Sequence, residues 1–493
     1  MKSYAFPSRP QQACQWLAHQ AGGAIAALPA LAALALLAGC TTPEKVTLDR
    51  QVPAQWVQAP AAAASAATMP AAWWQAWNDP VLDGLVDEAL SANLDVAQAQ
   101  ARLRQQRILT NVAPAAHRPS LAFSQRVVQD VSATDSYFQA SIDMVWDIGL
   151  FGGAQANERS AQARLMDVSA KLQAARVSVA AEVVHRYLDI RLAQRQRVLA
   201  AQMTRLDDDA LRLADVRRQQ RIGTMEEVLQ LRSQAQARRG AVAQLVETQA
   251  RSAHALAVLL GRAEPDASWL AEDAAATLPD TTASTLTDLP ADMLRKRPDV
   301  QQAEAAVEEA AAEVGLARSA LYPRFQLVGS LLYSYNITAN RRSSSRNLPV
   351  FGPAIDIPLF DWTRRRAQVN AGEEGLQAAV LAYRQSVLEG VAEVESSLAA
   401  LSAQRSREQS LVESNRLVAE RLDLQARRAR LGLASEWVAV PDRLAALETQ
   451  SDIDTARASQ ALALAAVYKA LGSVPSVAES APQPAKPTQE PNS

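Results

Sequence analysis

The segment Phe138-Gln-Ala-Ser-Ile-Asp-Met-Val-Trp-Asp-Ile148 decides the fold of this chain. Its even-numbered positions are all apolar, and four of the five odd-numbered positions between them are polar or charged. A period of two predicts a β-strand with one strongly apolar face. The segments that begin at Leu121 and Phe325 repeat this alternation. Each predicted strand is about ten residues long, which is the length that crosses a lipid bilayer when the strand is tilted.

The sequence therefore predicts two pairs of transmembrane strands, and a soluble four-stranded sheet packed on helices is the alternative. Four strands are too few to close a barrel with a useful bore. An open sheet cannot lie in lipid, because the amide groups of its edges would stay unpaired. If the strands cross a membrane, several chains must share one barrel.

Helices are expected to make up most of the chain. Aromatic residues are only 5% of the 493 residues, and long tracts rich in Ala, Leu, Gln, Arg and Glu favour helix. Residues 154–221 predict one helix, which would span roughly 100 Å at 1.5 Å per residue. Leucines recur along it every seven residues, as in a coiled-coil seam, at Leu192, Leu199, Leu206 and Leu213. A similar step from Val387 to Leu401 ends in the polar residues Glu408 and Asn415, which predicts a looser seam.

Two landmarks of the sequence recur at a spacing of 209 residues. Trp146-Asp-Ile-Gly-Leu-Phe151 matches Ile355-Asp-Ile-Pro-Leu-Phe360, and Arg221-Ile-Gly-Thr224 matches Arg430-Leu-Gly-Leu433. The equal spacing indicates an internal duplication in which the intervening segment has one length in both copies. Each copy is expected to contain a helical run, two strands, a long helix, a turn and a returning helix. The glycine of each turn would end its long helix, since glycine adopts positive φ easily.

The beginning of the chain predicts an exported lipoprotein. Lys2 and Arg9 precede the apolar stretch 24–37, which is too short to span a bilayer permanently and is typical of a signal peptide. Leu37-Ala-Gly-Cys40 resembles a bacterial lipobox, in which the cysteine becomes the acylated N-terminus. Thr41 follows this cysteine where an Asp would favour inner-membrane retention, so the outer membrane is the expected destination. The covalent lipid on Cys40 is the one expected cofactor.

Composition and repeats divide the chain into six predicted segments. These are a signal peptide at 1–39, a lipidated tether at 40–72, a first repeat at 73–262, a connecting segment at 263–290, a second repeat at 291–472 and a disordered tail at 473–493. The tether and the tail are rich in Pro and Ala and lack a sustained apolar period.

Several classes of function are excluded or disfavoured. The formal net charge is −2 and no extended Lys/Arg-rich block occurs, so no nucleic-acid partner is expected. The histidines of the mature chain, His117, His185 and His254, are widely separated. No cluster has metal-ligand spacing, and neither a Gly-rich phosphate loop nor a nucleophile elbow occurs. We therefore expect no catalytic residue, no metal site and no enzymatic activity.

Three motifs carry a resemblance to a known family. They are Arg297-Pro-Asp-Val-Gln-Gln-Ala-Glu304, Gly352-Pro-Ala-Ile-Asp-Ile-Pro-Leu-Phe-Asp361 and Trp77-Asn-Asp-Pro-Val-Leu82. With them, residues 73–472 resemble the TolC-like outer-membrane factors, in the NodT-type lipoprotein branch. Members of this branch serve as exit ducts of tripartite resistance-nodulation-division (RND) efflux pumps.

The resemblance implies a mainly α-helical protein with a small transmembrane β part. Three identical chains would each supply four strands to a shared twelve-stranded barrel above a long α-helical barrel, in the outer membrane and periplasm. The implied function is passive export of drugs or other small toxic molecules. A tunnel for type I protein secretion has the same fold and is one alternative. A periplasmic coiled-coil scaffold lipoprotein without membrane strands is another.

The resemblance also implies where partners dock. The periplasmic tip would be formed by the two turns, at Gly223 and Thr224 in the first copy and at Gly432 and Leu433 in the second. A periplasmic adaptor, and through it the inner-membrane RND transporter, would bind there.

The family closes its tip with ion pairs and acidic side chains that must separate for opening. Arg428, by its position before Gly432, matches the gating arginine. Pro441 occupies the acidic position without a gap, and Asp442 occupies it with one inserted residue. Asp207 and Asp208, with Asp209, could form an acidic ring in a trimer, and a solvated helix face is the alternative.

Overall fold

The computed structural model describes residues 72–129, 135–273, 275–281, 291–338, 345–433 and 435–474. Cys40, most of the predicted tether and nearly all of the predicted tail lie outside these residues. The chain forms two compact units, each built from discontinuous segments. The strand unit contains residues 107–164 and 306–380, and the helical unit contains the remaining described residues.

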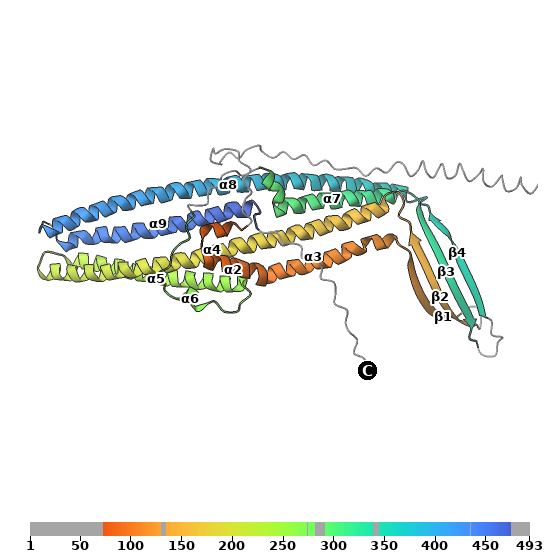
Figure 1. Ribbon diagram of the computed structural model, residues 1–493, viewed down its shortest axis with the longest axis horizontal. Coiled ribbons are helices and arrows are strands. Elements are labelled where there is room, and N and C mark those ends of the chain that lie inside the picture. The colour runs from red at the N-terminus through yellow and green to blue at the C-terminus, as the bar shows by residue number, and fades with distance from the viewer. Residues whose placement is uncertain are drawn as a thin grey trace, which may run out of the picture. The chain divides into compact units, whose positions relative to one another are not determined.

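The strand unit contains one antiparallel sheet. Its strands are β1 (Ser120–Gln129), β2 (Ser136–Asp147), β3 (Arg324–Asn336) and β4 (Ser345–Asp356), in the spatial order β1-β2-β3-β4 (Figure 1). The four predicted strands are thus confirmed, and they pair across the duplication because β2 of the first copy bonds to β3 of the second. This leaves β1 and β4 as the edges of the sheet.

Helix ends and short loops close one end of this sheet. The indole Nε1 of Trp146 donates to the carbonyl of His117 in the 3₁₀ turn η2 (Ala113–His117), at 2.9 Å. The ring of Phe151 stacks on Tyr322, with centroids 4.8 Å apart. The sheet is therefore fixed to the helix ends by aromatic side chains at the places where the sequence motifs recur.

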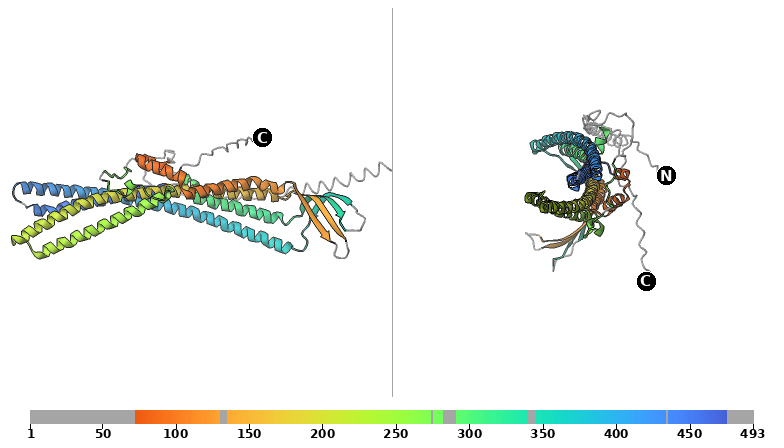
Figure 2. Two further views of the ribbon diagram at one scale, coloured as in Figure 1. Left: turned by 90° about the horizontal axis from the view of Figure 1, so that it is seen from below. Right: turned by 90° about the vertical axis from the view of Figure 1, so that its left-hand side faces the viewer.

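Helices form the other unit and continue into the first. Their bounds are η1 (Trp73–Trp77), α2 (Pro80–Ala92), α3 (Leu94–Val112), α4 (Gly153–Gln219), α5 (Met225–Leu259), α6 (Ala267–Leu270), η3 (Ala291–Lys296), α7 (Pro298–Ser319), α8 (Trp362–Arg430) and α9 (Glu436–Ala470). The longest are α4 with 67 residues and α8 with 69. In two views, α5 returns along α4 and α9 returns along α8 (Figures 1 and 2). The expected mainly helical fold with a small β part is confirmed.

The core of the helical unit contains a cluster of tryptophans. Trp73, Trp74 and Trp77 are buried, and the ring of Trp73 stacks on Tyr468 of α9 with centroids 4.9 Å apart. Around them pack apolar residues of α2, α4, α5 and α9, among them Leu82, Val184, Leu188, Leu256 and Leu464. The residues just after the predicted tether are thus held firmly in the core.

The motif at Trp77 has a local physical explanation. Asn78 adopts a left-handed conformation with φ of 52°, and Asp79 caps α2 by accepting from the amides of Val81 and Leu82. Proline at the first helical position is favourable because its missing N–H would have no partner there. The second carboxylate oxygen of Asp79 accepts from the hydroxyl of Tyr187, at 2.6 Å. Burial raises the pKa of Tyr187, so this hydroxyl stays a donor.

The turns that end α4 and α8 correct one inference from the sequence. The residues with positive φ are Arg221, at 61°, and Gly432, at 70°, and Gly223 is not among them. Each turn contains the longer hydrogen bond of a Schellman motif. In the first turn the amide of Ile222 donates to the carbonyl of Arg217, and in the second the amide of Leu433 donates to the carbonyl of Arg428. The expectation that both glycines supply the positive φ is therefore wrong for Gly223.

The same turns revise the inferred length of the duplicated segment. The starts of α4 and α8 are 209 residues apart, but the starts of α5 and α9 are 211 apart. The second long helix is two residues longer than the first. The glycines share the 209-residue spacing without occupying equivalent positions.

Candidate functional site

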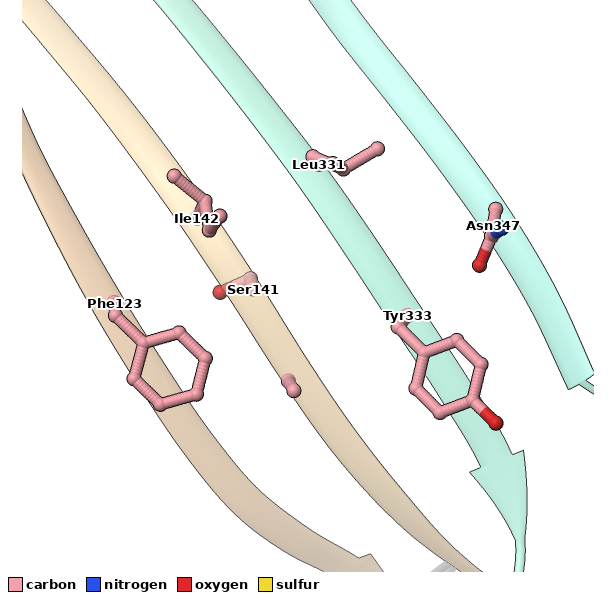
Figure 3. Close-up of a pocket in the computed structure, with 7 residues that line it drawn as sticks. Phe123, Ser141, Ile142, Leu331, Tyr333 and Asn347 are labelled. Carbon is pink, nitrogen blue, oxygen red and sulfur yellow. The ribbon is translucent and has the colours of Figure 1, made fainter.

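One face of the sheet is apolar and open. The side chains on it are exposed in the single chain, among them Leu121, Phe123, Val127, Leu331, Phe351 and Ile355. The register brings Phe123 opposite Ile142, Ile142 opposite Leu331, and Leu331 opposite Pro349, so this face continues across all four strands. A pocket on the sheet is lined by residues of every strand, including Phe123, Tyr333 and Asn347 (Figure 3). This broad apolar surface requires an apolar environment.

The other face of the sheet is polar and internally hydrogen-bonded. The carboxylate of Asp143 accepts from the hydroxyl of Ser330 at 2.6 Å, from Ser141 at 2.7 Å and from Ser124 at 3.4 Å. These three serines lie on β3, β2 and β1, so one carboxylate connects three strands. The sheet therefore has the two unlike faces that the alternation predicts.

The first turn presents apolar side chains and a well-formed helix start. Thr224 and Glu227 make a capping box at the start of α5. Ile222 is 69% exposed and Met225 is 51% exposed. The predicted contact residues Gly223 and Thr224 thus lie between exposed apolar side chains.

The second turn has the same character with a weaker cap. Leu431 and Leu433 are each 74% exposed, on either side of Gly432. Ser435 stands at the start of α9 and makes no side-chain cap hydrogen bond. The guanidinium of Arg217 lies 5.1 Å from the ring centroid of Trp437, which links the two turn regions within one chain.

The candidate gate residues do not meet as a single set. Asp442 pairs with Arg421 of α8, with nitrogen and oxygen 2.6 Å apart. Arg428 contributes its carbonyl to the turn, and it forms no ion pair with Asp442 in the structure. Pro441 lies inside α9, five residues after its first residue, so the helix does not start at this proline.

The acidic run on α4 is paired within the chain rather than wholly solvated. Asp207 is buried and pairs with Arg238 of α5 at 2.8 Å. The same guanidinium also pairs with Glu448 of α9 at 3.0 Å. Asp208 pairs with Arg239 at 2.9 Å. Burial is the largest influence on Asp207 and raises the pKa of its carboxyl, despite the neighbouring arginine.

The sequence did not lead us to Arg238 and Glu448 as partners of the acidic run, although a pattern in the sequence does point to Arg238. In an antiparallel helical hairpin, residues at equal distances from the turn face each other. Asp207 and Arg238 lie 15 and 16 residues from Ile222, so a hairpin centred there brings them together. Glu448 comes from the other copy and could not be found by this rule.

The motif at Arg297 has a structural role, because it connects helices. Arg297 is 6% exposed, and its guanidinium pairs with Asp299 at 2.8 Å and with Glu393 of α8 at 2.6 Å. It also donates to the carbonyl of Ala470 at the end of α9. The motif therefore joins the start of α7 to both helices of the second hairpin.

Within the described residues, no helix is long and apolar enough to cross a membrane, and no group of side chains has the composition of a metal site.

Comparisons with known proteins agree with this arrangement. The family model described as outer membrane efflux protein matches residues 85–262 and 289–473, one segment in each copy. Nodulation protein T of Rhizobium leguminosarum bv. trifolii is 26% identical, over 87% of this chain and 92% of that protein. The pyoverdine export outer membrane protein OpmQ of Pseudomonas putida is 28% identical, over 89% of this chain and 95% of its own length.

Solved structures share the fold over most of the chain. The outer-membrane channel OprN aligns with a TM-score of 0.77 and 25% identity, covering 88% of this chain and 99% of that one. The open state of the Neisseria gonorrhoeae MtrE outer membrane channel aligns with a TM-score of 0.72 and 22% identity, covering 88% and 98%.

Proposed function

Because this chain belongs to the outer membrane efflux protein family and forms an exit duct for efflux across the outer membrane, we propose that three copies assemble into one closed conduit. Each copy supplies four strands to a twelve-stranded barrel. The observation that carries this proposal is the open sheet with one apolar face. In lipid the free edges of β1 and β4 need partners, and the edges of neighbouring copies provide them.

The conduit is passive, and its driving force comes from a pump. We place the loops between paired strands at the cell exterior and the helices in the periplasm. The exported molecules are drugs or other small toxic compounds. A relative of this chain exports pyoverdine, which supports small organic molecules rather than polypeptides as the cargo. The four strands disfavour a purely periplasmic scaffold.

The periplasmic adaptor binds at the turns. Exposed Ile222, Leu431 and Leu433 give these turns an apolar surface that a partner would cover. The adaptor connects the conduit to an inner-membrane RND transporter. Gly223, Thr224 and Gly432 belong to the same contact surface by their position in the turns.

The gate is a set of ion pairs near the turns. We assign to it the pairs of Asp207 and Asp208 on α4 and of Asp442 on α9, together with Arg428. Opening requires the α8–α9 hairpin to move relative to α4 and α5. The Arg238–Glu448 pair resists this movement, because it joins the two hairpins of one chain.

Acyl chains on Cys40 anchor the protein to the outer membrane. Two or three chains give stable attachment, whereas one is marginal. The buried tryptophans of η1 hold the other end of the tether. Substitution Cys40→Ala is expected to reduce the outer-membrane fraction of the protein, measured by membrane fractionation.

Deletion and reconstitution test the function together. Deleting the chain should raise susceptibility to several small toxic compounds, and the purified protein should conduct ions across a planar bilayer. Loss of an exported polypeptide, with unchanged susceptibility, would instead indicate type I secretion. A protein that stays a water-soluble monomer without detergent would refute the shared barrel.

A further inference from the structure

The charges of the sheet are sorted onto one face. The described strands contain six charged residues, which are Arg126, Asp143, Asp147, Arg324, Arg346 and Asp356. Side chains alternate between faces along a strand, and residues directly opposite in the register share a face. By this rule all six lie on the polar face, and the face that contains Phe123 and Ile142 has none.

Two arginines occupy the row nearest the loops between paired strands. The register aligns Arg126 of β1 with Gln139, Gln139 with Ser334, and Ser334 with Arg346 of β4. The guanidinium Nε of Arg126 donates to the amide oxygen of Gln139, a neutral partner, at 3.1 Å. Both arginine side chains are exposed. This row carries two positive charges per chain.

The middle row is negative. Asp143 is opposite Ala122 on one side and Ser330 on the other, and its hydrogen bonds come from serine hydroxyls. These neutral donors fix the position of the carboxylate, and the charge of Arg126 is a weaker electrostatic influence on it. The row therefore carries one negative charge per chain.

The row nearest the helices is mixed. Arg324 is opposite Asp356 in the register, and its Nε lies 3.7 Å from the carboxylate of Asp147. One cation thus stands between two anions, and the net charge of this group is also negative. Positive charge lies at the loop end of the sheet, and negative charge lies at the middle and at the helical end.

The spacing of the rows limits how strongly they interact. Gln139 and Asp143 are four residues apart on β2, which is about 13 Å along the strand. The Debye length is about 8 Å at physiological ionic strength, so cellular salt weakens the interaction of Arg126 with Asp143 without removing it. In dilute salt the rows interact more strongly.

We propose that this face lines the conduit and makes it an ion-selective pore, with a positive ring of Arg126 and Arg346 at the outer mouth and a negative ring of Asp143 beneath it. The inference rests on the proposed function, because only a closed trimer places the polar face around a lumen. Low-dielectric walls strengthen such fields. The outer ring concentrates anionic solutes at the mouth and opposes the return of cationic ones.

Reversal potentials of the full-length protein in planar bilayers test this selectivity. In a dilute KCl gradient, the double variant Arg126→Gln with Arg346→Gln should lower the chloride-to-potassium permeability ratio by roughly sevenfold, because a potential of about one kT changes the chloride and potassium concentrations about threefold each in opposite directions. Asp143→Asn should raise the same ratio. Both shifts should shrink at about 1 M salt, where the Debye length is about 3 Å.

Matched variants separate charge from structure. Arg126→Lys with Arg346→Lys keeps both charges and should preserve the native ratio. Ala122→Cys, on the polar face, should react with a water-soluble thiol reagent in the bilayer, and Phe123→Cys, on the apolar face, should not. The reverse labelling pattern would show that the charges face lipid and would overturn the proposal.

The two proposals fail in different ways. If the native protein conducts normally but the double glutamine variant keeps the native permeability ratio, the charge rings are refuted and the conduit stands. An equal loss of selectivity in the lysine variants would refute the rings as well. If the purified protein instead stays a water-soluble monomer without detergent, the closed trimeric conduit itself is refuted.

Discussion

In both repeats a side chain binds a backbone carbonyl at the end of the returning helix, at corresponding places in the two copies. The side chains that do so differ in charge. In the first repeat, the side-chain amide of Asn93, before α3, donates to the carbonyl of Leu259 at the end of α5, at 2.9 Å. In the second, Arg297, before α7, donates to the carbonyl of Ala470 at the end of α9. Asn93 is neutral, whereas Arg297 is charged and has Asp299 and Glu393 as partners.

The two copies thus share one topology but are stabilised by different interactions. Asn93 also caps α3, because its side-chain oxygen accepts from the amide of Val96. Arg297 instead joins α7 and α8 through ion pairs and α9 through a hydrogen bond to the carbonyl of Ala470. The first interaction is between neutral groups, whereas the second depends on a buried guanidinium with charged partners.

The long helices of the two repeats also differ, in how many of their residues are buried near the turn. Along α4, Ala210 and Ala214 remain fully buried close to the turn. Along α8, no described residue after Leu401 is buried. The polar residues Glu408 and Asn415 occupy the positions where the seven-residue step would place apolar ones. This part of α8 is therefore less buried within the chain than the corresponding part of α4, which suits a segment that moves during opening.

The largest expected effect is a difference in stability between variants of Arg297 and of Asn93. Arg297→Ala leaves Glu393 and the carbonyl of Ala470 without their donor and should destabilise the protein by about 3 kcal/mol, the upper end for hydrogen bonds of a charged group, since both carboxylate partners are about half exposed. Asn93→Ala removes a cap and one long-range hydrogen bond and should cost about 1–3 kcal/mol. Denaturant unfolding in detergent measures both. Equal losses would show that the charge adds nothing to the second interaction.

A smaller effect concerns Asp207, which pairs with Arg238 within the first hairpin. Burial raises the pKa of Asp207, so the folded chain binds a proton more readily than the unfolded chain at this site. The contribution of this group is most favourable below the ordinary aspartate pKa, and it declines as the pH rises through the raised value. Asp207→Asn should remove this part of the pH dependence of the unfolding midpoint, measured by thermal scans.

Asp208→Asn is the matched control for that prediction. Asp208 pairs with Arg239 on an exposed surface, with 57% of its side chain accessible, and exposed ion pairs contribute little. A pH profile that changes as much in this variant as in Asp207→Asn would contradict the role assigned to burial.

The smallest effect concerns the two turns. Arg221 holds a positive φ that a residue with a Cβ adopts at a cost of about 1–2 kcal/mol, so Arg221→Gly should stabilise the protein by roughly 0.5–1 kcal/mol after the entropy of glycine is included. Gly432→Ala should destabilise it by about 1 kcal/mol. A Cβ at Gly432 would meet no atom within 4 Å, so the loss would be conformational alone. Small midpoint shifts of opposite sign are the expected observation.

Local pattern was sufficient for much of this protein. The alternation around Ile142 predicts a strand, the seven-residue step of Leu192 and Leu199 predicts a long helix, and both depend on which neighbours along the chain share a face. The motif before α2 was recognised only as a mark of the family resemblance, although an aspartate before a proline at the first helical position is a local signal of a helix start.

Partners from distant segments were decided only by the tertiary structure. The sequence could not show that Arg297 reaches Ala470, that Glu448 joins Asp207 through Arg238, or that Asp442 pairs with Arg421 instead of Arg428. The sequence also suggested, wrongly, that Gly223 is equivalent to Gly432. The two glycines are 209 residues apart, but α8 is two residues longer than α4, so the turn after α8 begins two residues later than that spacing implies. Periodicity specifies the face on which a side chain lies, but pairing depends on helix length and packing across the whole fold.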